Sequence, residues 1–462
     1  MLMHPSTANG TTSRHSFWLR VREFAVPPSM IETATARRRV GDWAGACAAA
    51  GFDVDIDLRT VTRVHGRGLA ARVRDDLRSL APDLLRWHLP RVAPDGLLRP
   101  GLTMSLARYG GDEHGNGCGE AGSVHLVART APAWADAGQR VSLALWDGSG
   151  DRDVGTLHPH PRPDRRYRLD LHRHLWDSRR SDELRIRSGA VRLDSPGDIE
   201  NQLSGAAPPG CAVDRWSDEA GILLRAERSA DGRVLVRAGV RRRIVLELPS
   251  HAGDPPDVRI AERYPRGEMT GLPVLPDAAT WMLPDLELMR AGAITADRLH
   301  PLVASALDPG HSRSETSGGA AQDGRTLVVE CRGELHRVAL VDGVLAALDH
   351  DPAEVRREEL LVALTGTPLP CLQAIDRAHR RPDWLSDVRE RLMHGDTAGA
   401  LTVVERALGP DALLREGALR DELEAAARQR ITYGLFRSGL AKPFPCMPRP
   451  KHRAHPRNAT FR

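Results

Sequence analysis

Lysine is almost missing from this chain of 462 residues. Of its 65 lysine and arginine residues, only Lys442 and Lys451 are lysines, and both lie in the last 21 positions. The body of the chain therefore offers no primary amine for a phosphate-binding loop, a Schiff base or a protein-kinase active site. The excess of arginine, beside abundant alanine, glycine, aspartate and proline, is typical of a bacterial coding sequence of high GC content. A single arginine is for that reason weak support for phosphate or acid recognition here.

Other features are scarce as well. No run of about 18 apolar residues occurs, which predicts no membrane span and no membrane partner. The first 28 residues lack the apolar core of a secretory signal. The nucleophile elbow, the zinc-protease helix, the EF-hand loop and the lysine-bearing phosphate loop are all missing. Together these absences lower the expectation of catalysis and predict a cytoplasmic protein.

The cysteines are too scattered to form a recognisable framework. No two of them have the spacing of a CxxC pair or of a compact disulfide scaffold. They are Cys47, Cys118, Cys211, Cys331, Cys371 and Cys446. This pattern predicts reduced thiols, as in the cytosol.

The rest of the composition is that of an ordinary globular protein. Hydrophobic residues make up 41% and charged residues 27%, although aromatic residues contribute only 4%. The length predicts two to four domains. Because 65 basic residues nearly balance 61 acidic ones, the chain as a whole carries no nucleic-acid signature. Any basic binding surface has to be local.

The order of periodic segments predicts a multidomain α+β fold. It has a helical amino-terminal region, a central antiparallel β-sandwich-like domain and a helix-rich carboxy-terminal region. The expected divisions are 1–29 (poorly ordered), 30–100 (helical), 101–260 (antiparallel β), 261–308 (helical), 309–324 (flexible linker), 325–440 (β-hairpin and helices) and 441–462 (disordered basic tail).

Short runs of alternating apolar and polar residues define the central β domain. They cover residues 122–130, 140–146, 166–176, 182–187, 222–228, 233–240 and 242–248. An Asp-Gly pair between two such runs is typical of a tight hairpin, and both Asp231-Gly232 and Asp342-Gly343 have this placement. Seven or eight short strands in succession predict a sandwich or an open barrel.

The densest group of potential ligands lies at residues 157–177. In a strand over this stretch, Asp170, His172 and His174 share one face, opposite the apolar residues. Two imidazoles and one carboxylate on an open face are a plausible site for zinc or a similar divalent metal. The alternative is a half-buried strand whose polar side chains face water.

The glycine-rich segment 109–122 contains a second group. Its glycines match GxGxxG, but a strand pattern follows where a dinucleotide site needs a helix. A loop thiol flanked by glycine is accessible, so Cys118 is a candidate nucleophile with His114 or His125 as its base. The alternative is a long loop between strands.

The pair His350-Asp351 allows two interpretations. Adjacent histidine and aspartate occur in metal-dependent phosphohydrolases, which need further ligands on neighbouring helices. Asp351, Pro352 and Glu354 also have the order of a capped helix start. The helix start is the favoured interpretation.

The tail is the one locally basic segment, because both lysines lie in it. Lys442, Arg449, Lys451, Arg453 and Arg457 have no acidic residue among them. They are candidates for binding nucleic acid or an acidic protein patch. The alternative is a solvated, disordered end.

These observations favour a cytoplasmic, non-enzymatic interaction or scaffold protein that binds a protein partner and needs no cofactor. The first alternative is a metal-dependent hydrolase built on Asp170, His172 and His174. The second is a nucleic-acid-associated protein that uses the basic tail.

Overall fold

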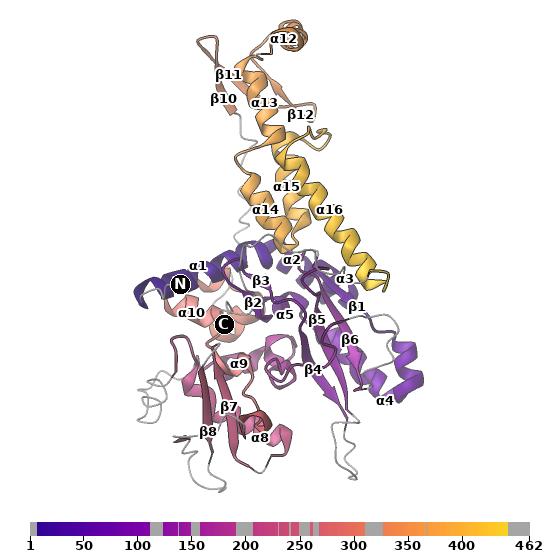
Figure 1. The fold of residues 1–462 in the computed structure, drawn as a ribbon, viewed down its shortest axis with the longest axis vertical. Coiled ribbons are helices and arrows are strands. Elements are labelled where there is room, and N and C mark those ends of the chain that lie inside the picture. Colours follow the sequence, from indigo (N-terminus) through magenta and orange to yellow (C-terminus); the bar gives the residue numbers. More distant parts are fainter. Residues whose placement is uncertain are drawn as a thin grey trace. The chain divides into compact units, whose positions relative to one another are not determined.

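The computed structural model describes residues 7–110, 123–136, 138–148, 158–190, 207–229, 231–239, 242–248, 259–261, 268–309, 327–366 and 368–441. The chain divides into two compact units (Figure 1). Unit 1 comprises Met1–Ser314 and Phe436–Arg462, and unit 2 comprises Glu315–Leu435. Both contain helices and strands, which confirms the predicted mixed α+β class.

A four-stranded sheet organises the first half of unit 1. Its strand order is β1-β6-β5-β4, in which β1 is parallel to β6 and the other neighbours are antiparallel. The strands are β1 (Phe52–Val54), β4 (Thr103–Tyr109), β5 (Val124–Thr130) and β6 (Val141–Trp146), beside a ribbon of β2 (Arg91–Val92) and β3 (Leu97–Leu98). The helices are α1 (Thr7–Arg20), α2 (Pro28–Arg39), α3 (Trp43–Ala49), α4 (Leu58–Ser79) and α5 (Pro82–His88).

The amino-terminal segment belongs to the core, so the predicted disorder of residues 1–29 is wrong for the part that the structure describes. Helix α1 continues into a π-helical turn at Val21–Ala25. Phe17 and Trp18 are at most 5% exposed, and the Trp18 and Trp87 rings meet edge-on with centroids 5.7 Å apart. Because arginines lie between the apolar residues of this segment, the sequence pattern did not reveal the helix.

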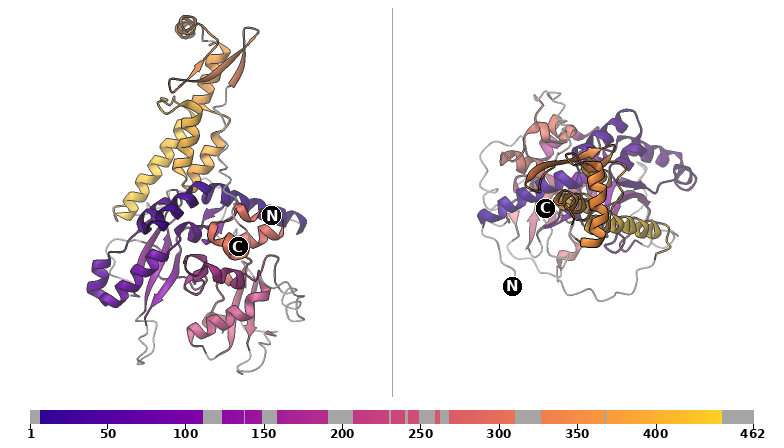
Figure 2. Two further views of the ribbon diagram at one scale, coloured as in Figure 1. Left: turned by 180° about the vertical axis from the view of Figure 1, so that it is seen from behind. Right: turned by 90° about the horizontal axis from the view of Figure 1, so that it is seen from above.

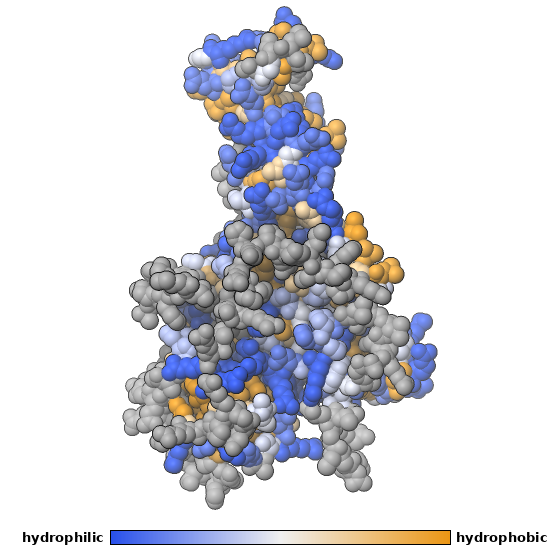
Figure 3. All heavy atoms as spheres, in the orientation of Figure 1, coloured by the Kyte–Doolittle hydropathy of each residue, from blue (hydrophilic) through white to orange (hydrophobic). Residues whose placement is uncertain are grey.

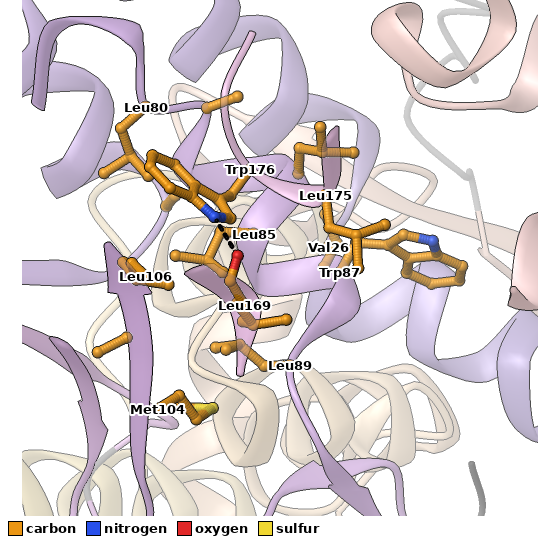
Figure 4. Packing of buried hydrophobic residues seen from close by; sticks show 14 of the residues in the cluster. Val26, Leu80, Leu85, Trp87, Leu89, Met104, Leu106, Leu169, Leu175 and Trp176 are labelled. Atoms are coloured by element: carbon orange, nitrogen blue, oxygen red, sulfur yellow. Dashed lines mark hydrogen bonds between the residues drawn. The ribbon is translucent and has the colours of Figure 1, made fainter. Parts of the chain in front are cut away.

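The core of unit 1 includes the fully buried Trp176. Its indole nitrogen donates a hydrogen bond of 3.0 Å to the carbonyl oxygen of Leu169, which satisfies the one polar atom of the ring. Figure 4 shows Leu80 and Leu85 beside this indole and Leu106 of β4 in the same cluster. The cluster extends along the sequence from Phe17 to Ala306, and it ties α1 to α5 and the sheet.

The second half of unit 1 has a sheet and a core of its own. The antiparallel strands are β7 (Arg233–Ala238), β8 (Arg242–Glu247) and β9 (Arg259–Ile260), and the helices of this core are α8 (Trp216–Glu227) and α9 (Asp277–Thr280). Three further helices bury their apolar residues in the first cluster: α6 (Leu184–Arg187), α10 (Pro284–Arg290) and α11 (Pro301–Leu307). Helix α8 packs on β7 and β8 (Figure 2). Because the two sheets of unit 1 bury separate clusters, they do not form the single sandwich that the number of strands suggested.

Three of the predicted strands in this region are helical instead. Residues 166–176 form two consecutive 3-10 turns, residues 182–187 form a helical turn, and residues 222–228 lie largely in α8. In α8, Trp216 and Ala220 are buried four positions apart, as expected for one face of a helix. The short window 222–228 was too narrow to reveal that spacing.

Buried arginines connect distant segments of unit 1. The guanidinium of Arg86, on α5, donates to the carbonyl oxygens of Ala25 at 3.0 Å and of Gln139 at 2.7 Å. The guanidinium of Arg166 donates two hydrogen bonds to the Asp277 carboxylate, at 3.1 and 2.8 Å. A buried guanidinium is costly without acceptors, so each of these arginines restricts where the segment that supplies the oxygen can lie.

Unit 2 combines a small sheet with a set of helices. The antiparallel strands β10 (Leu327–Cys331), β11 (Glu334–Val341) and β12 (Val344–Ala347) are followed by α12 (Pro352–Thr365), α13 (Pro370–Arg380), α14 (Leu385–His394), α15 (Thr397–Leu408) and α16 (Ala418–Arg437). The turn between β11 and β12 is Asp342-Gly343, with φ values of 50° and 79°, as a tight two-residue hairpin requires. This confirms the predicted hairpin.

Helix α12 starts as the sequence predicts. A carboxylate oxygen of Asp351 accepts a hydrogen bond of 3.0 Å from the backbone nitrogen of Ala353, which confirms the capping interpretation. Among the described residues, no helix combines the length and the apolar character needed to cross a membrane. The linker from residue 310 to 324 and the basic tail from Lys442 onward lie outside the described residues.

The burial of Trp18 predicts that α1 contributes strongly to stability. We expect Trp18→Ala to lower the free energy of unfolding by about 3–5 kcal/mol, because a large buried ring leaves a cavity. Val40→Ala is the control, since Val40 is 78% exposed and its truncation should change stability by less than about 0.5 kcal/mol. Urea unfolding followed by circular dichroism measures both, and equal stability of the two variants would contradict the role given to α1.

Candidate metal centre

Two cysteines and a histidine converge in unit 2. Cys331 is the last residue of β10, His350 lies between β12 and α12, and Cys371 lies in the first turn of α13. The two sulfur atoms and one ring nitrogen of His350 all lie within 4.8 Å of one another. A tetrahedral zinc ion bound to sulfur at about 2.3 Å holds its ligand atoms roughly 3.5–3.8 Å apart. Small side-chain movements would therefore bring the three atoms onto one ion.

The group lies inside a very small hydrophobic core. Cys331 and Cys371 are both fully buried, and the other buried members of the cluster are Val338, Leu369 and Ile375. Neither cysteine is in a disulfide. A core with so few apolar residues buries little surface and contributes correspondingly little stability by itself. A bound ion would add the stability that this small apolar core does not provide.

The β10–β11 hairpin positions the first of these ligands. Its turn is Arg332-Gly333, with φ values of 56° and 85°, which the missing side chain of Gly333 makes easy to adopt. Cys331 thus pairs with Glu334 directly across the turn. The Arg332 guanidinium reaches α12, where it contacts the carboxylate of Glu354 at 2.6 Å. This contact links the hairpin to the helix that follows His350.

A second histidine lies against the first. His336 of β11 stacks on His350 with ring centroids 4.1 Å apart and an angle of 9° between the planes. Nδ1 of His336 and Nε2 of His350 are both buried, and neither has a hydrogen-bond partner among the described residues. Unpaired buried nitrogens are unfavourable, and coordination of a metal would satisfy them.

The opposite nitrogen of each ring faces a carboxylate. Nδ1 of His350 lies 4.0 Å from an oxygen of Glu354, and Nε2 of His336 lies 3.9 Å from an oxygen of Glu334. Histidines that bind metals commonly direct their second nitrogen to a carboxylate, which orients the ring and strengthens the ligand. Both rings therefore have the surroundings of metal ligands, but only His350 is among the three converging ligands, and His336 would have to turn its stacked ring to become the fourth.

The chemistry of Cys371 suits an ion as well. Burial and the neighbouring thiol of Cys331 raise the pKa of Cys371 to about 11, so the metal-free thiol is protonated at neutral pH. A bound cation removes that proton and is itself held by the thiolate. The position of Cys371 in the first turn of α13 adds the favourable end of a helix dipole.

Sequence reasoning missed this group for a clear reason. The four residues have the spacing C-x4-H-x13-H-x20-C, which contains no CxxC pair. The available signal was the predicted hairpin over residues 325–347, which places Cys331 and His336 on adjacent strands. Only the packing of α13 against β10 shows that Cys371 joins them.

The predicted cluster of Asp170, His172 and His174 has a different environment. Asp170 lies on the 3-10 turn Leu169–Leu171, His174 lies on the 3-10 turn Arg173–Leu175 and His172 lies between the two turns, so the three do not share one face of a strand. The Asp170 carboxylate accepts two hydrogen bonds of 2.8 Å from Arg168. The two histidine rings are neighbours, with centroids 5.8 Å apart. The structure thus brings the histidines together and pairs the aspartate with an arginine.

The nitrogens of His172 already have protein partners. Nδ1 lies 3.0 Å from the carbonyl oxygen of Arg168, and Nε2 lies 3.1 Å from a carboxylate oxygen of Glu219. Burial by itself would raise the pKa of Glu219, but His172 and Arg187 more than offset this and lower that pKa. The arrangement is that of a buried ion-pair network that holds α8 to the 3-10 turns.

His174 is completely buried beside that network. Burial lowers its pKa well below 6.5, and the neighbouring His172 and Arg187 lower it further. His174 is therefore neutral in the folded protein at neutral and mildly acidic pH.

Several other candidate residues lie outside the described part of the chain. This applies to Cys118 and His114, and to the basic residues of the tail. The nucleophile and nucleic-acid hypotheses thus remain predictions. His125 is described: it lies on β5, where its ring nitrogens approach the hydroxyl oxygens of Ser105 at 3.1 Å and Ser123 at 3.0 Å.

Comparisons of the chain with protein-family models, with curated proteins and with solved structures gave no match. The interpretation of the site consequently depends on its own geometry and chemistry.

The burial of His174 predicts a loss of stability in mild acid. Below pH 6.5 the unfolded chain takes up a proton at this residue and the folded chain does not, so the free energy of unfolding falls by up to about 1.4 kcal/mol per pH unit for that proton. We expect His174→Gln to flatten the dependence between pH 7 and pH 5. His160→Gln, at an exposed position, should leave the slope unchanged. Equal slopes in both variants, measured by urea unfolding, would refute this.

Proposed function

We propose that this chain is a non-enzymatic binding protein in which unit 2 is a protein-docking module stabilised by zinc. The observation that carries the proposal is the convergence of Cys331, His350 and Cys371 in a minimal core, with the ring of His336 stacked on that of His350. Two thiolates and two imidazoles form one of the standard ligand sets of structural zinc sites.

The surroundings of the four side chains favour a structural role over a catalytic one. A catalytic zinc ion keeps one position open for water or substrate, whereas here His336 lies against His350 and would reach the fourth position by a turn of its ring. Both cysteines are fully buried. An ion in this place would clamp the hairpin to the start of α13, so metal binding and the folding of this part of unit 2 would be linked.

The surface of the same unit supports protein binding. Val328 of β10 is 56% exposed, Leu335 of β11 is 73% exposed, and Leu360 of α12 is 70% exposed. Figure 3 shows hydrophobic residues on the surface at β10 and β11 and beside α12. None of the side chains described in α12 is buried. Exposed aliphatic residues gathered on one small module are typical of a site for a protein partner with an aliphatic surface.

The thiols agree with a reducing compartment. Cys47, Cys211, Cys331 and Cys371 are all free. Zinc-bound thiolates persist where disulfides do not form, so a cytoplasmic location is part of the proposal.

Measurement of bound metal directly tests the proposed zinc ion that links the hairpin to α13. We expect the purified full chain to carry about one zinc ion, because the three converging ligand atoms can hold one ion. Cys371→Ser and His350→Asn should each remove most of this zinc. Each should also lower the melting temperature of unit 2 by at least about 5 °C, since 1 kcal/mol shifts a domain near 100 residues by roughly 4–8 °C.

The matched control is Cys211→Ser, which changes a cysteine of unit 1 that is not a member of the group. It should keep the zinc. Treatment of the unaltered chain with a chelator separates loss of the ion from the effect of a substitution, and it should lower the same melting transition. A wild-type chain free of zinc after growth in zinc-rich medium, with no response to added zinc, would remove the clamp from the proposal.

The docking surface is tested with a double variant. Leu335→Glu combined with Leu360→Glu places two charges on the exposed aliphatic surface and should abolish recovery of a partner from the native host. Ile186→Glu alters a 75% exposed residue of unit 1 and should leave recovery intact. The partner is identified by mass spectrometry and then titrated as a purified protein against all three chains. Equal binding by all three would contradict docking through this surface.

A further inference from the structure

A pocket of about 160 Å³ opens within unit 1, separate from the metal centre of unit 2. Its wall combines residues of β4, β5 and β6 with the segment 162–168, with α8 and with the residues before α9. It therefore lies where the two halves of unit 1 meet. Junctions of this kind are common places for small-ligand sites.

The lining is strongly basic. It includes Arg108, Arg162, Arg165 and Arg168, and its one carboxylate is that of Glu227. Four arginines among thirteen lining residues are roughly twice the share that arginine has in the whole chain, so the abundance of arginine does not by itself explain them. With His125 neutral, the lining carries three net positive charges.

Two of these arginines are held in place by carboxylates. The guanidinium of Arg168 donates two hydrogen bonds to Asp170, at 2.8 Å each, and also contacts Glu227. The guanidinium of Arg108 lies 3.7 Å from Glu227. Glu227 is thus shared between two guanidinium groups, and when Asp170 is included the site still carries two net positive charges. Arg108 and Arg168 are balanced by these two carboxylates, and the excess positive charge comes from the other arginines of the lining; such a lining suits the recognition of an oxyanion.

Neutral groups complete one side of the pocket. The Ser123 hydroxyl oxygen lies 3.0 Å from Nε2 of His125, and the Ser105 hydroxyl oxygen lies 3.1 Å from Nδ1. The His125 ring meets Trp146 edge-on, with centroids 5.2 Å apart. These contacts engage both nitrogens of the imidazole and orient the Ser123 hydroxyl, which can donate to an acceptor when Nε2 of His125 donates to its oxygen.

The remaining wall is apolar. Trp146, Leu223, Pro273 and Val274 contribute to it. A ligand that is only an inorganic anion would leave this part of the lining in contact with water. A ligand with a flat apolar portion would cover it and gain from the contact.

We propose that this pocket binds a small molecule in which an oxyanion, either a phosphate or a carboxylate, is attached to an aromatic group. The arginines bind the oxyanion of the ligand, and the tryptophan and the aliphatic residues contact its aromatic ring. All residues of this site belong to unit 1.

Calorimetric titration of the full chain at low salt tests the proposal with four probes. Phenyl phosphate and benzoate carry both features, inorganic phosphate lacks the ring, and phenol lacks the charge. We expect at least one of the first two to bind at least tenfold more tightly than inorganic phosphate and phenol. Its affinity should fall in 0.5 M salt, because the charges near the surface are screened.

Substitutions connect binding to the pocket. Arg165→Gln, at an exposed position, and Arg108→Gln, on β4, should each weaken binding of that probe by on the order of tenfold. Arg185→Gln changes an exposed arginine of α6 outside the lining and should leave affinity unchanged. The proposal is overturned if neither phenyl phosphate nor benzoate binds, if inorganic phosphate or phenol binds as tightly as they do, or if all three variants bind alike.

Discussion

Unit 1 depends on buried guanidinium groups and the oxygen atoms that receive them. Arg86 is almost completely buried, and it is held by backbone carbonyl oxygens from two other segments. Arg215 does the same with the carbonyl oxygen of Trp281, at 2.9 Å. A charge removed from water must find acceptors, so these contacts decide which segments lie together. In a chain with few aromatic residues, they add directional constraints to a core that is otherwise aliphatic.

The two units are stabilised in different ways. Unit 1 has an extended cluster that joins α1, α5 and the first sheet, and its charged network holds the second sheet close to it. Unit 2 has several small clusters, and the one beneath the hairpin contains two cysteines among five buried residues. A thiol buries less surface than a leucine side chain, but it binds a soft metal far better. The proposed zinc ion would thus take over the role that aliphatic packing has in unit 1.

Arginines of the same chain have two distinct roles. Arg166 is bonded to a nearly buried carboxylate, and this pair fixes the relation between the segment 162–168 and α9. Arg108 and Arg168 share Glu227 at the edge of a pocket whose lining carries more arginines than carboxylates. The count of arginines could not separate these roles, because both kinds have the same local sequence context. The separation depends on how many carboxylates the fold brings to each guanidinium.

The sequence alone determined the features that depend on interactions between residues close together in the chain. The α+β class, the Asp342-Gly343 turn and the Asp351 cap depend on residues within a few positions of one another, and all three were predicted correctly. Tertiary structure decided the rest. Phe17 and Trp18 are buried because α5 supplies Trp87, the segment 166–176 turns because its charged side chains find partners elsewhere, and Cys371 meets Cys331 because α13 packs on β10. Such contacts join residues tens to hundreds of positions apart, and no local pattern encodes them.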